Sequence, residues 1–353
     1  MVNINLETLN DKQKTCLTQL SYLNINEDGC KKILVDGLLV SDLISYIDDF
    51  DSFFVGDAGL NEKLVEKLSD KVLGENNFVS KLDIFSGLMQ SGLGDLKIIN
   101  VSEKKNLKSS GFQALTFKDS CGNIGISYRG SDFEFSQGGA RDWLEADMLE
   151  YFTGKSTQKE EALSYFELNR NSNGNNFLYG HSLGGNLASH TYVEYYNEIK
   201  QVFTINGNPI NQKLLNNSER IAAFNNPNKF QCNIICGDVV GLLKSNEIYK
   251  NNVNYVCNNN TMNKSFISAH LVQSATYDEF GNFITANEVE MVEQMKSRTN
   301  TLMKFIQNVR ENLNKVEQKF EGIPSKNLFS SYRTSVNNHF KTIIGKFKDK
   351  QND

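Results

Sequence analysis

Short apolar runs alternate with amphipathic stretches through the middle of the chain. Strand composition, rich in β-branched and aromatic residues, marks segments 96–102, 111–119, 123–131, 175–182, 201–207, 230–238 and 252–258. Helical patterns occupy 141–152 and 159–171, before the fourth of these strands, and 185–199, directly after it. Strands alternating with helices predict an α/β fold with a mainly parallel sheet flanked by helices.

The first 95 residues differ from this central part. They read as helices and loops, with an apolar stretch from Ile33 to Ile47 and no chemical motif. We expect a helical N-terminal region, 1–95, packed on a catalytic unit that spans 96–285.

The last part of the chain, 286–353, has a third character. A stripe of residues that are apolar except for Thr299 keeps an unbroken three-four spacing at Val292, Met295, Thr299, Leu302, Ile306, Val309, Leu313, Val316 and Phe320. This a/d stripe predicts a long helix, and a second amphipathic stretch follows the breakers Gly322 and Pro324. From residue 285 onward Lys and Arg exceed Asp and Glu by 12 to 8, whereas the rest of the chain is net negative. We expect a helical hairpin that binds a partner or targets the protein; the alternative is that it covers the body's own surface.

Composition excludes several classes of protein. A mean hydropathy of −0.43 and the lack of an apolar run of about 20 residues argue against a membrane span. The N-terminus lacks a basic segment followed by an apolar one, so no signal peptide is expected and the chain should be cytoplasmic as synthesised. A net charge of −5 makes nucleic acid an improbable partner. Six cysteines without a CxxC pair and four scattered histidines do not form a zinc motif, and we expect no metal or cofactor.

The strongest motif is Gly180-His181-Ser182-Leu183-Gly184, which fits G-x-S-x-G between an apolar strand and a helix. In such an elbow the serine lies on a sharp strand-to-helix turn, where glycines avoid collisions with the neighbouring backbone. The N–H of Leu183, at the start of the helix, can donate to an oxyanion. The motif therefore predicts Ser182 as a nucleophile in an α/β-hydrolase fold.

A nucleophilic serine needs a base, and the chain has four histidines. His181 adjoins the serine, so its ring should point away from Oγ, and His190 lies two turns along the elbow helix. His339 belongs to the C-terminal hairpin. Elimination and chain order leave His270 as the predicted base.

The acid that orients this histidine should lie between Ser182 and His270 in the chain. Asp238 follows an apolar strand directly, at the strand's carboxyl end. Glu247 and Asp278 are competitors, but neither follows an apolar strand so closely. Asp238 is therefore the predicted acid, which would hold the imidazole tautomer.

Together these residues resemble the class 3 lipases, and the resemblance covers about residues 96–285. Tyr128-Arg129-Gly130-Ser131 followed by Arg141-Asp142-Trp143 is similar to that family's aromatic-Arg-Gly-Ser/Thr strand end and its downstream Asn/Asp-Trp. The resemblance implies that Ser131 donates to the oxyanion through its backbone N–H and hydroxyl, beside Leu183. The segment 132–140, with two phenylalanines, matches a lid, although an ordinary surface loop would look the same.

This chain departs from the family in two places. His270 lies 32 residues after Asp238, closer than in many fungal members, and Asn206-Gly207-Asn208-Pro209 replaces a commoner Gly-x-Pro turn. It looks closer to a bacterial branch of these hydrolases. The C-terminal hairpin also resembles helical targeting domains of effectors exported by type VII-like systems, which need no cleaved leader.

The function implied is hydrolysis of glycerolipid or phospholipid esters through an acyl-enzyme on Ser182, with brief contact with a membrane surface. Expected partners are the lipid or acyl-ester substrate and a helical partner or secretion chaperone at the hairpin. One alternative is a soluble esterase for short acyl chains. The other is a binding or effector protein whose hydrolase fold is vestigial.

Overall fold

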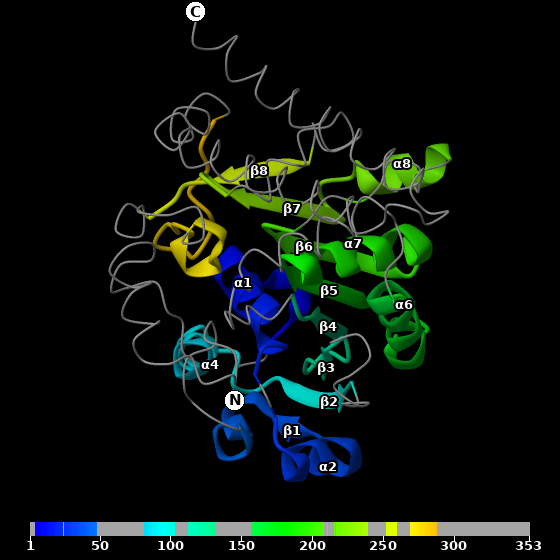
Figure 1. Ribbon diagram of the computed structural model, residues 1–353, viewed down its shortest axis with the longest axis vertical. Helices are drawn as coiled ribbons and strands as arrows, with labels where there is room; N and C mark the ends of the chain where they lie inside the picture. The colour runs from blue at the N-terminus through cyan, green and yellow to red at the C-terminus, as the bar shows by residue number, and fades with distance from the viewer. Residues whose placement is uncertain are drawn as a thin grey trace, which may run out of the picture.

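The structure is a computed structural model that describes residues 4–23, 25–47, 81–102, 112–130, 157–207, 210, 215, 217–238, 252–259 and 269–287. Its elements, in chain order, are η1 (Leu6–Thr8), α1 (Asp11–Leu20), α2 (Glu27–Asp36), β1 (Leu38–Leu39), η2 (Val40–Tyr46), α4 (Lys81–Gln90), β2 (Lys97–Val101), β3 (Ala114–Lys118), β4 (Ile124–Tyr128), α6 (Thr157–Asn169), β5 (Asn176–His181), α7 (Leu183–Tyr195), β6 (Ile199–Ile205), α8 (Ser218–Phe224), β7 (Phe230–Ile235), β8 (Val253–Val256) and η7 (Val272–Ser274). Figure 1 shows them around one central sheet.

The sheet joins these eight strands in the order of the sequence, β1 to β8. The pairs from β1 to β4 are antiparallel, and the pairs from β4 to β8 are parallel. The expected α/β class is therefore confirmed, with a sheet that is parallel in four of its seven pairs. The antiparallel part arises because β2, β3 and β4 follow one another without a crossover helix among the described residues.

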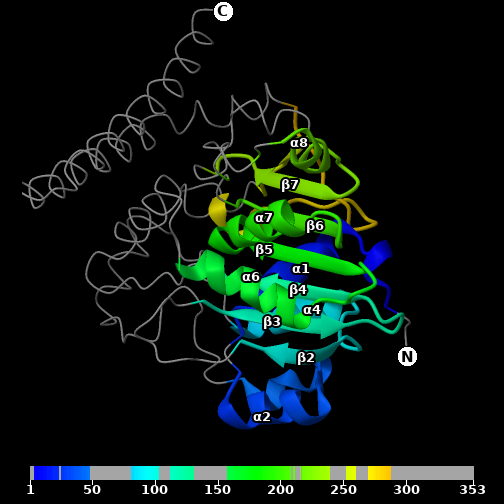
Figure 2. The ribbon, with the colours of Figure 1, turned by 90° about the vertical axis from the view of Figure 1, so that its right-hand side faces the viewer.

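The parallel strands explain where the helices lie. A parallel crossover is right-handed, so successive crossovers that advance in one direction place their helices on the same face of a sheet. α6, α7 and α8 are such connections, and Figure 2 shows α6 and α7 together in front of the sheet. Their buried apolar side chains pack against one set of alternate strand residues, including Ile126, Leu178, Val202, Cys232 and Ile234.

The opposite face of the sheet is covered by the N-terminal helices. α1, α2 and α4 pack against the other set of alternate residues, which includes Phe117, Phe177, Tyr179, Phe203 and Ile205. α1 lies behind the sheet in Figure 2, with its Leu17 and Leu20 fully buried. Apolar side chains on both sides of the same strands thus account for two cores.

α1 has a defined start and direction. Asn10 and Gln13 form a capping box at its N-terminus. Lys14 donates to Gln231 Oε1 near the start of β7, while Tyr22, just past the last turn, reaches His181 at the end of β5. α1 therefore runs along the strands, and its last turn lies at their carboxyl ends.

Several expectations concern residues that the structure does not describe. They are the helix at 141–152, the segment at 132–140 and, beyond residues 286 and 287, the C-terminal hairpin. The three-part division of the chain stays a prediction. Within the described ranges, no helix combines the length and apolar character required to cross a bilayer.

Candidate active site

Ser182 occupies the turn between β5 and α7. Its backbone has φ 57° and ψ −128°, a conformation that favours glycine and is costly for a residue with a side chain. The glycines on either side of Ser182 are required because the neighbouring backbone leaves no room for a Cβ. A Cβ on Gly180 would lie 2.2 Å from the carbonyl oxygen of Gly184, and a Cβ on Gly184 would lie 2.1 Å from that of Tyr128. The turn therefore brings strand and helix closer than side chains would permit.

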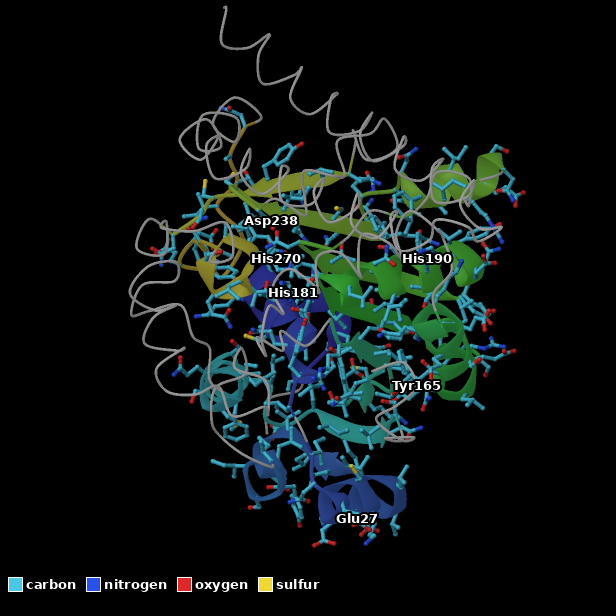
Figure 3. All side chains as sticks on the ribbon, viewed as in Figure 1. Glu27, Tyr165, His181, His190, Asp238 and His270 are labelled. Atoms are coloured by element: carbon cyan, nitrogen blue, oxygen red, sulfur yellow. The ribbon has the colours of Figure 1, made fainter. Side chains whose placement is uncertain are left out.

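Three predicted residues meet at this turn. His270 Nε2 lies 2.8 Å from Ser182 Oγ, and His270 Nδ1 lies 2.8 Å from Asp238 Oδ1. All three residues are buried. Figure 3 shows Asp238 and His270 next to each other.

The carboxylate of Asp238 fixes the tautomer of His270. An ionised carboxylate only accepts hydrogen bonds, so Nδ1 carries the ring proton and donates a hydrogen bond to Asp238. Nε2 is then left to accept the hydroxyl proton of Ser182. The three side chains have the geometry that a nucleophile, a base and an orienting acid require.

The other residues considered as base or acid lie elsewhere in the structure or outside the described residues. His190 lies on α7, away from the other labelled histidines in Figure 3. Burial, with a smaller effect of nearby Lys159, lowers the pKa of His190 to about 3. Glu247 and His339 lie outside the described residues.

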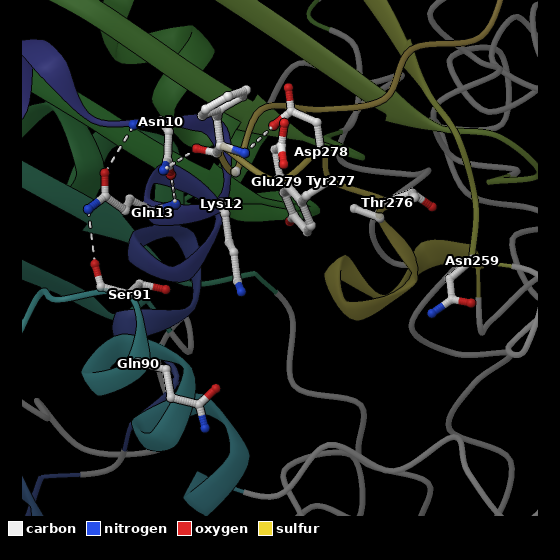
Figure 4. A pocket seen from close by; sticks show the side chains of 13 residues that line it. Asn10, Lys12, Gln13, Gln90, Ser91, Asn259, Thr276, Tyr277, Asp278 and Glu279 are labelled. Carbon is white, nitrogen blue, oxygen red and sulfur yellow. Dashed lines mark hydrogen bonds between the residues drawn. The ribbon is translucent and has the colours of Figure 1, made fainter.

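Asp278, the remaining competitor, lines a different cavity. This cavity has a volume of about 500 Å³ and lies beside Asn10, Lys12 and Ser91, near the start of α1 (Figure 4). The Asp278 carboxylate accepts hydrogen bonds from the N–H groups of Phe280 and Asn282. It therefore shapes a local turn, and the triad residues do not line this cavity.

The predicted oxyanion residues are described only in part. Leu183 is buried and begins α7, directly after Ser182. Ser131 lies outside the described residues, but Gly130, just before it, packs on the elbow. A Cβ on Gly130 would lie 2.2 Å from Tyr22 Oη and 3.2 Å from Ser182 Cβ. The end of β4 therefore approaches Ser182 closely.

The sequence did not indicate three further residues at this site, namely His181, Tyr22 and Asn206. The His181 ring centroid lies 4.9 Å from that of His270, and His181 Nε2 lies 2.8 Å from the His270 carbonyl oxygen. Tyr22 Oη lies 3.1 Å from His181 Nδ1. Asn206, in the left-handed region at φ 49°, donates through Nδ2 to the carbonyls of Ala269 and His270.

Burial dominates the electrostatics of His181. Burial, with a smaller contribution from the nearby His270 ring, lowers the pKa of His181 to about 3, while the hydrogen bond to the His270 backbone opposes the shift. His181 is therefore neutral at physiological pH. Among the described residues, no three His, Cys, Asp or Glu side chains are grouped as metal ligands.

No curated protein and no solved structure matches this chain. The sequence model of a family described as Mbeg1-like matches residues 90–321, more than half of the chain. The chain therefore belongs to the Mbeg1-like family.

Proposed function

We propose that the protein is a serine carboxylic-ester hydrolase of the α/β-hydrolase type, with Ser182 as nucleophile, His270 as base and Asp238 as orienting acid. The observation that carries this proposal is the chain of two 2.8 Å contacts from Ser182 through His270 to Asp238. The strained backbone of Ser182 adds to it, because such strain is concentrated at functional sites. The resemblance to class 3 lipases favours a glycerolipid or phospholipid substrate.

The reaction follows from the direction of these hydrogen bonds. Ser182 Oγ attacks the ester carbonyl while its proton passes to His270 Nε2, and Asp238 stabilises the imidazolium. The protonated His270 then gives this proton to the departing alcohol, leaving an acyl-enzyme. Water, deprotonated by His270, attacks the acyl carbon and releases the carboxylic acid and Ser182.

The oxyanion is assigned to the first turn of α7 and the end of β4. The N–H groups of Gly185 and Asn186 bond to the carbonyl of Ser182, which fixes this first turn. We assign the N–H of Leu183 as one oxyanion donor, and the N–H and hydroxyl of Ser131 as the other.

Replacing Ser131 by alanine tests this assignment. We expect kcat to fall by about 10²-fold or somewhat less, because the hydroxyl is lost while the backbone N–H survives. KM should change little, since the oxyanion forms only in the transition state. Steady-state kinetics on a soluble ester measures both. An unchanged kcat would remove Ser131 from the site.

Labelling with a fluorophosphonate tests the proposed function itself. The folded wild-type protein should form a covalent adduct, and the modified peptide should contain Ser182. No labelling of folded protein would favour the rival, a binding or effector protein with a vestigial hydrolase fold. Rates on esters of short and long acyl chains then separate a soluble esterase from a lipase.

The remaining parts of the proposal concern the C-terminal hairpin. We propose that 286–353 binds a helical partner or secretion chaperone for export by a type VII-like route. Its 12 basic residues, against 8 acidic ones from residue 285 onward, would also favour transient contact with an anionic membrane surface. Solubility, thermal melting and ester hydrolysis of a chain ending near residue 285 distinguish a separate module from a cover for the core.

A further inference from the structure

A tyrosine of the N-terminal region, Tyr22, reaches the active site. Tyr22 follows α1, is buried, and presents its hydroxyl to the carboxyl ends of β4 and β5. The backbone next to it is held in place, because the Ser127 hydroxyl of β4 donates to the Ser21 hydroxyl at 3.1 Å. Tyr22 lies outside the residues that the family model matches, which begin at 90.

The hydrogen bonds around Tyr22 have a defined direction. A carbonyl oxygen only accepts, so the 2.8 Å contact between His181 Nε2 and the His270 carbonyl requires a proton on Nε2. Nδ1 of the neutral ring then accepts, and the Tyr22 hydroxyl donates to it. The Tyr22 oxygen in turn accepts the N–H of Gly130 at 3.0 Å.

These bonds connect the two sides of the catalytic serine. Gly130 directly precedes Ser131, the proposed oxyanion donor, and His270 is the proposed base. The His270 carbonyl receives a second hydrogen bond, from Asn206 Nδ2 at 2.9 Å. The backbone of His270 is therefore held by two buried side chains, those of His181 at the end of β5 and Asn206 just after β6.

We propose that Tyr22 and His181 are positioning residues for acyl transfer, and that the N-terminal segment thereby completes the active site. Tyr22 sets the position of the β4 end at Gly130, and His181 transmits the constraint to the backbone of His270. Neither residue touches the reacting atoms. The inference rests on the proposed function, because positioning matters only if Ser182 and His270 perform the chemistry.

Tyr22→Phe is the first test, because it removes the hydroxyl and keeps the buried ring. We expect kcat to fall about tenfold with KM within about twofold, since Gly130 and His181 both lose a buried partner. Tyr192→Phe is the matched control. It removes another buried tyrosine hydroxyl, which donates to the carbonyl of Ala223 in α8 at 2.9 Å, and kcat should be unchanged.

Two substitutions at His181 separate positioning from packing. His181→Gln places an amide donor near the position of Nε2, so it should retain the bond to the His270 carbonyl. His181→Leu retains the volume and loses the donor. We expect His181→Gln to keep a larger share of kcat than His181→Leu, at similar melting temperatures.

A spectroscopic measurement tests the hydrogen-bond direction without any substrate. With selectively ¹⁵N-labelled histidine, only four residues contribute signals, and the His181→Gln variant identifies those of His181. We expect a neutral ring with the proton on Nε2 from pH 8 to pH 5, and a shift of the Nδ1 signal in Tyr22→Phe.

The outcomes are distinguishable. An active wild type whose Tyr22→Phe variant retains full kcat, or a His181 ring protonated on Nδ1, would overturn the inference alone. A wild type that neither hydrolyses esters nor reacts with a fluorophosphonate would overturn the proposed function, and the positioning role of Tyr22 with it. A tenfold loss of kcat in Tyr22→Phe, with kcat unchanged in Tyr192→Phe, supports both the proposed function and the positioning role.

Discussion

Ser182→Ala is expected to lower ester hydrolysis by a factor on the order of 10⁴ or more and to abolish fluorophosphonate labelling. In the proposed mechanism the Ser182 hydroxyl forms the acyl-enzyme, and alanine supplies no substitute for it. The fold should survive, because alanine retains the Cβ and the substitution removes only one hydroxyl. That hydroxyl is buried and its hydrogen-bond partner is His270 Nε2. Kinetics beside circular dichroism and thermal melting separates loss of chemistry from loss of structure.

His270→Ala should cost nearly as much as Ser182→Ala. The serine hydroxyl then has no base, and its partner at 2.8 Å is gone. The double variant should be scarcely worse than either single one, because residues that act as a unit are strongly non-additive.

A histidine outside the site supplies the matched control. His190→Ala should leave kcat close to the wild-type value, because His190 lies along α7, away from the His181 and His270 pair (Figure 3). If His190→Ala or His339→Ala silenced the enzyme and His270→Ala did not, the assignment of the base would be wrong.

The pattern of the sequence was sufficient to predict how Ser182, His270 and Asp238 come together. Two apolar runs, 175–182 and 230–238, read as parallel strands of one sheet, and such strands end at the same edge of a sheet. Ser182 and Asp238 follow from that edge, and His270 follows from chain order. The observed 2.8 Å contacts agree with this geometry, while the catalytic roles stay predictions.

The residues that support these three could not be predicted in the same way. Tyr22 and His181 are 159 positions apart, and their contact depends on which face of the sheet α1 covers. That face is settled by right-handed crossovers on the other side, a property of the whole topology rather than of any local pattern. Asn206 carried a weak signal, because asparagine tolerates the left-handed conformation, but its two carbonyl partners lie 63 and 64 positions away.

The role of His181 could not be predicted from its position in the motif alone. As the neighbour of the nucleophile, it was expected to point away from Oγ, and its hydrogen bonds do run elsewhere, to Tyr22 and the His270 carbonyl. Although its position excludes His181 as the base, the side chain still contacts the predicted site. A polar residue buried beside a reactive one needs partners, and its partners here belong to the site.

Acidification from pH 7 to pH 5 is expected to destabilise the folded protein by about 4 kcal/mol through two buried histidines. Burial lowers the pKa of both His181 and His190 from 6.5 to about 3. Below pH 6.5 the unfolded chain binds protons at these positions and the folded chain does not, so the free energy of unfolding falls as pH falls. Each histidine contributes on the order of 1 kcal/mol per pH unit in this window. Urea unfolding at half-unit pH intervals measures the loss.

His190→Gln isolates one of the two contributions. Glutamine is polar and does not titrate, so the variant should lose roughly half as much stability over the same interval, on the order of 1 to 2 kcal/mol. The range ends at pH 5 because carboxyl groups with ordinary pKa values near 4 begin to titrate below it. The difference in unfolding free energy between wild type and His190→Gln should therefore change steadily in favour of the variant as pH falls from 6.5 to 5. A difference that is independent of pH would show that His190 becomes protonated in the folded protein as readily as in the unfolded chain.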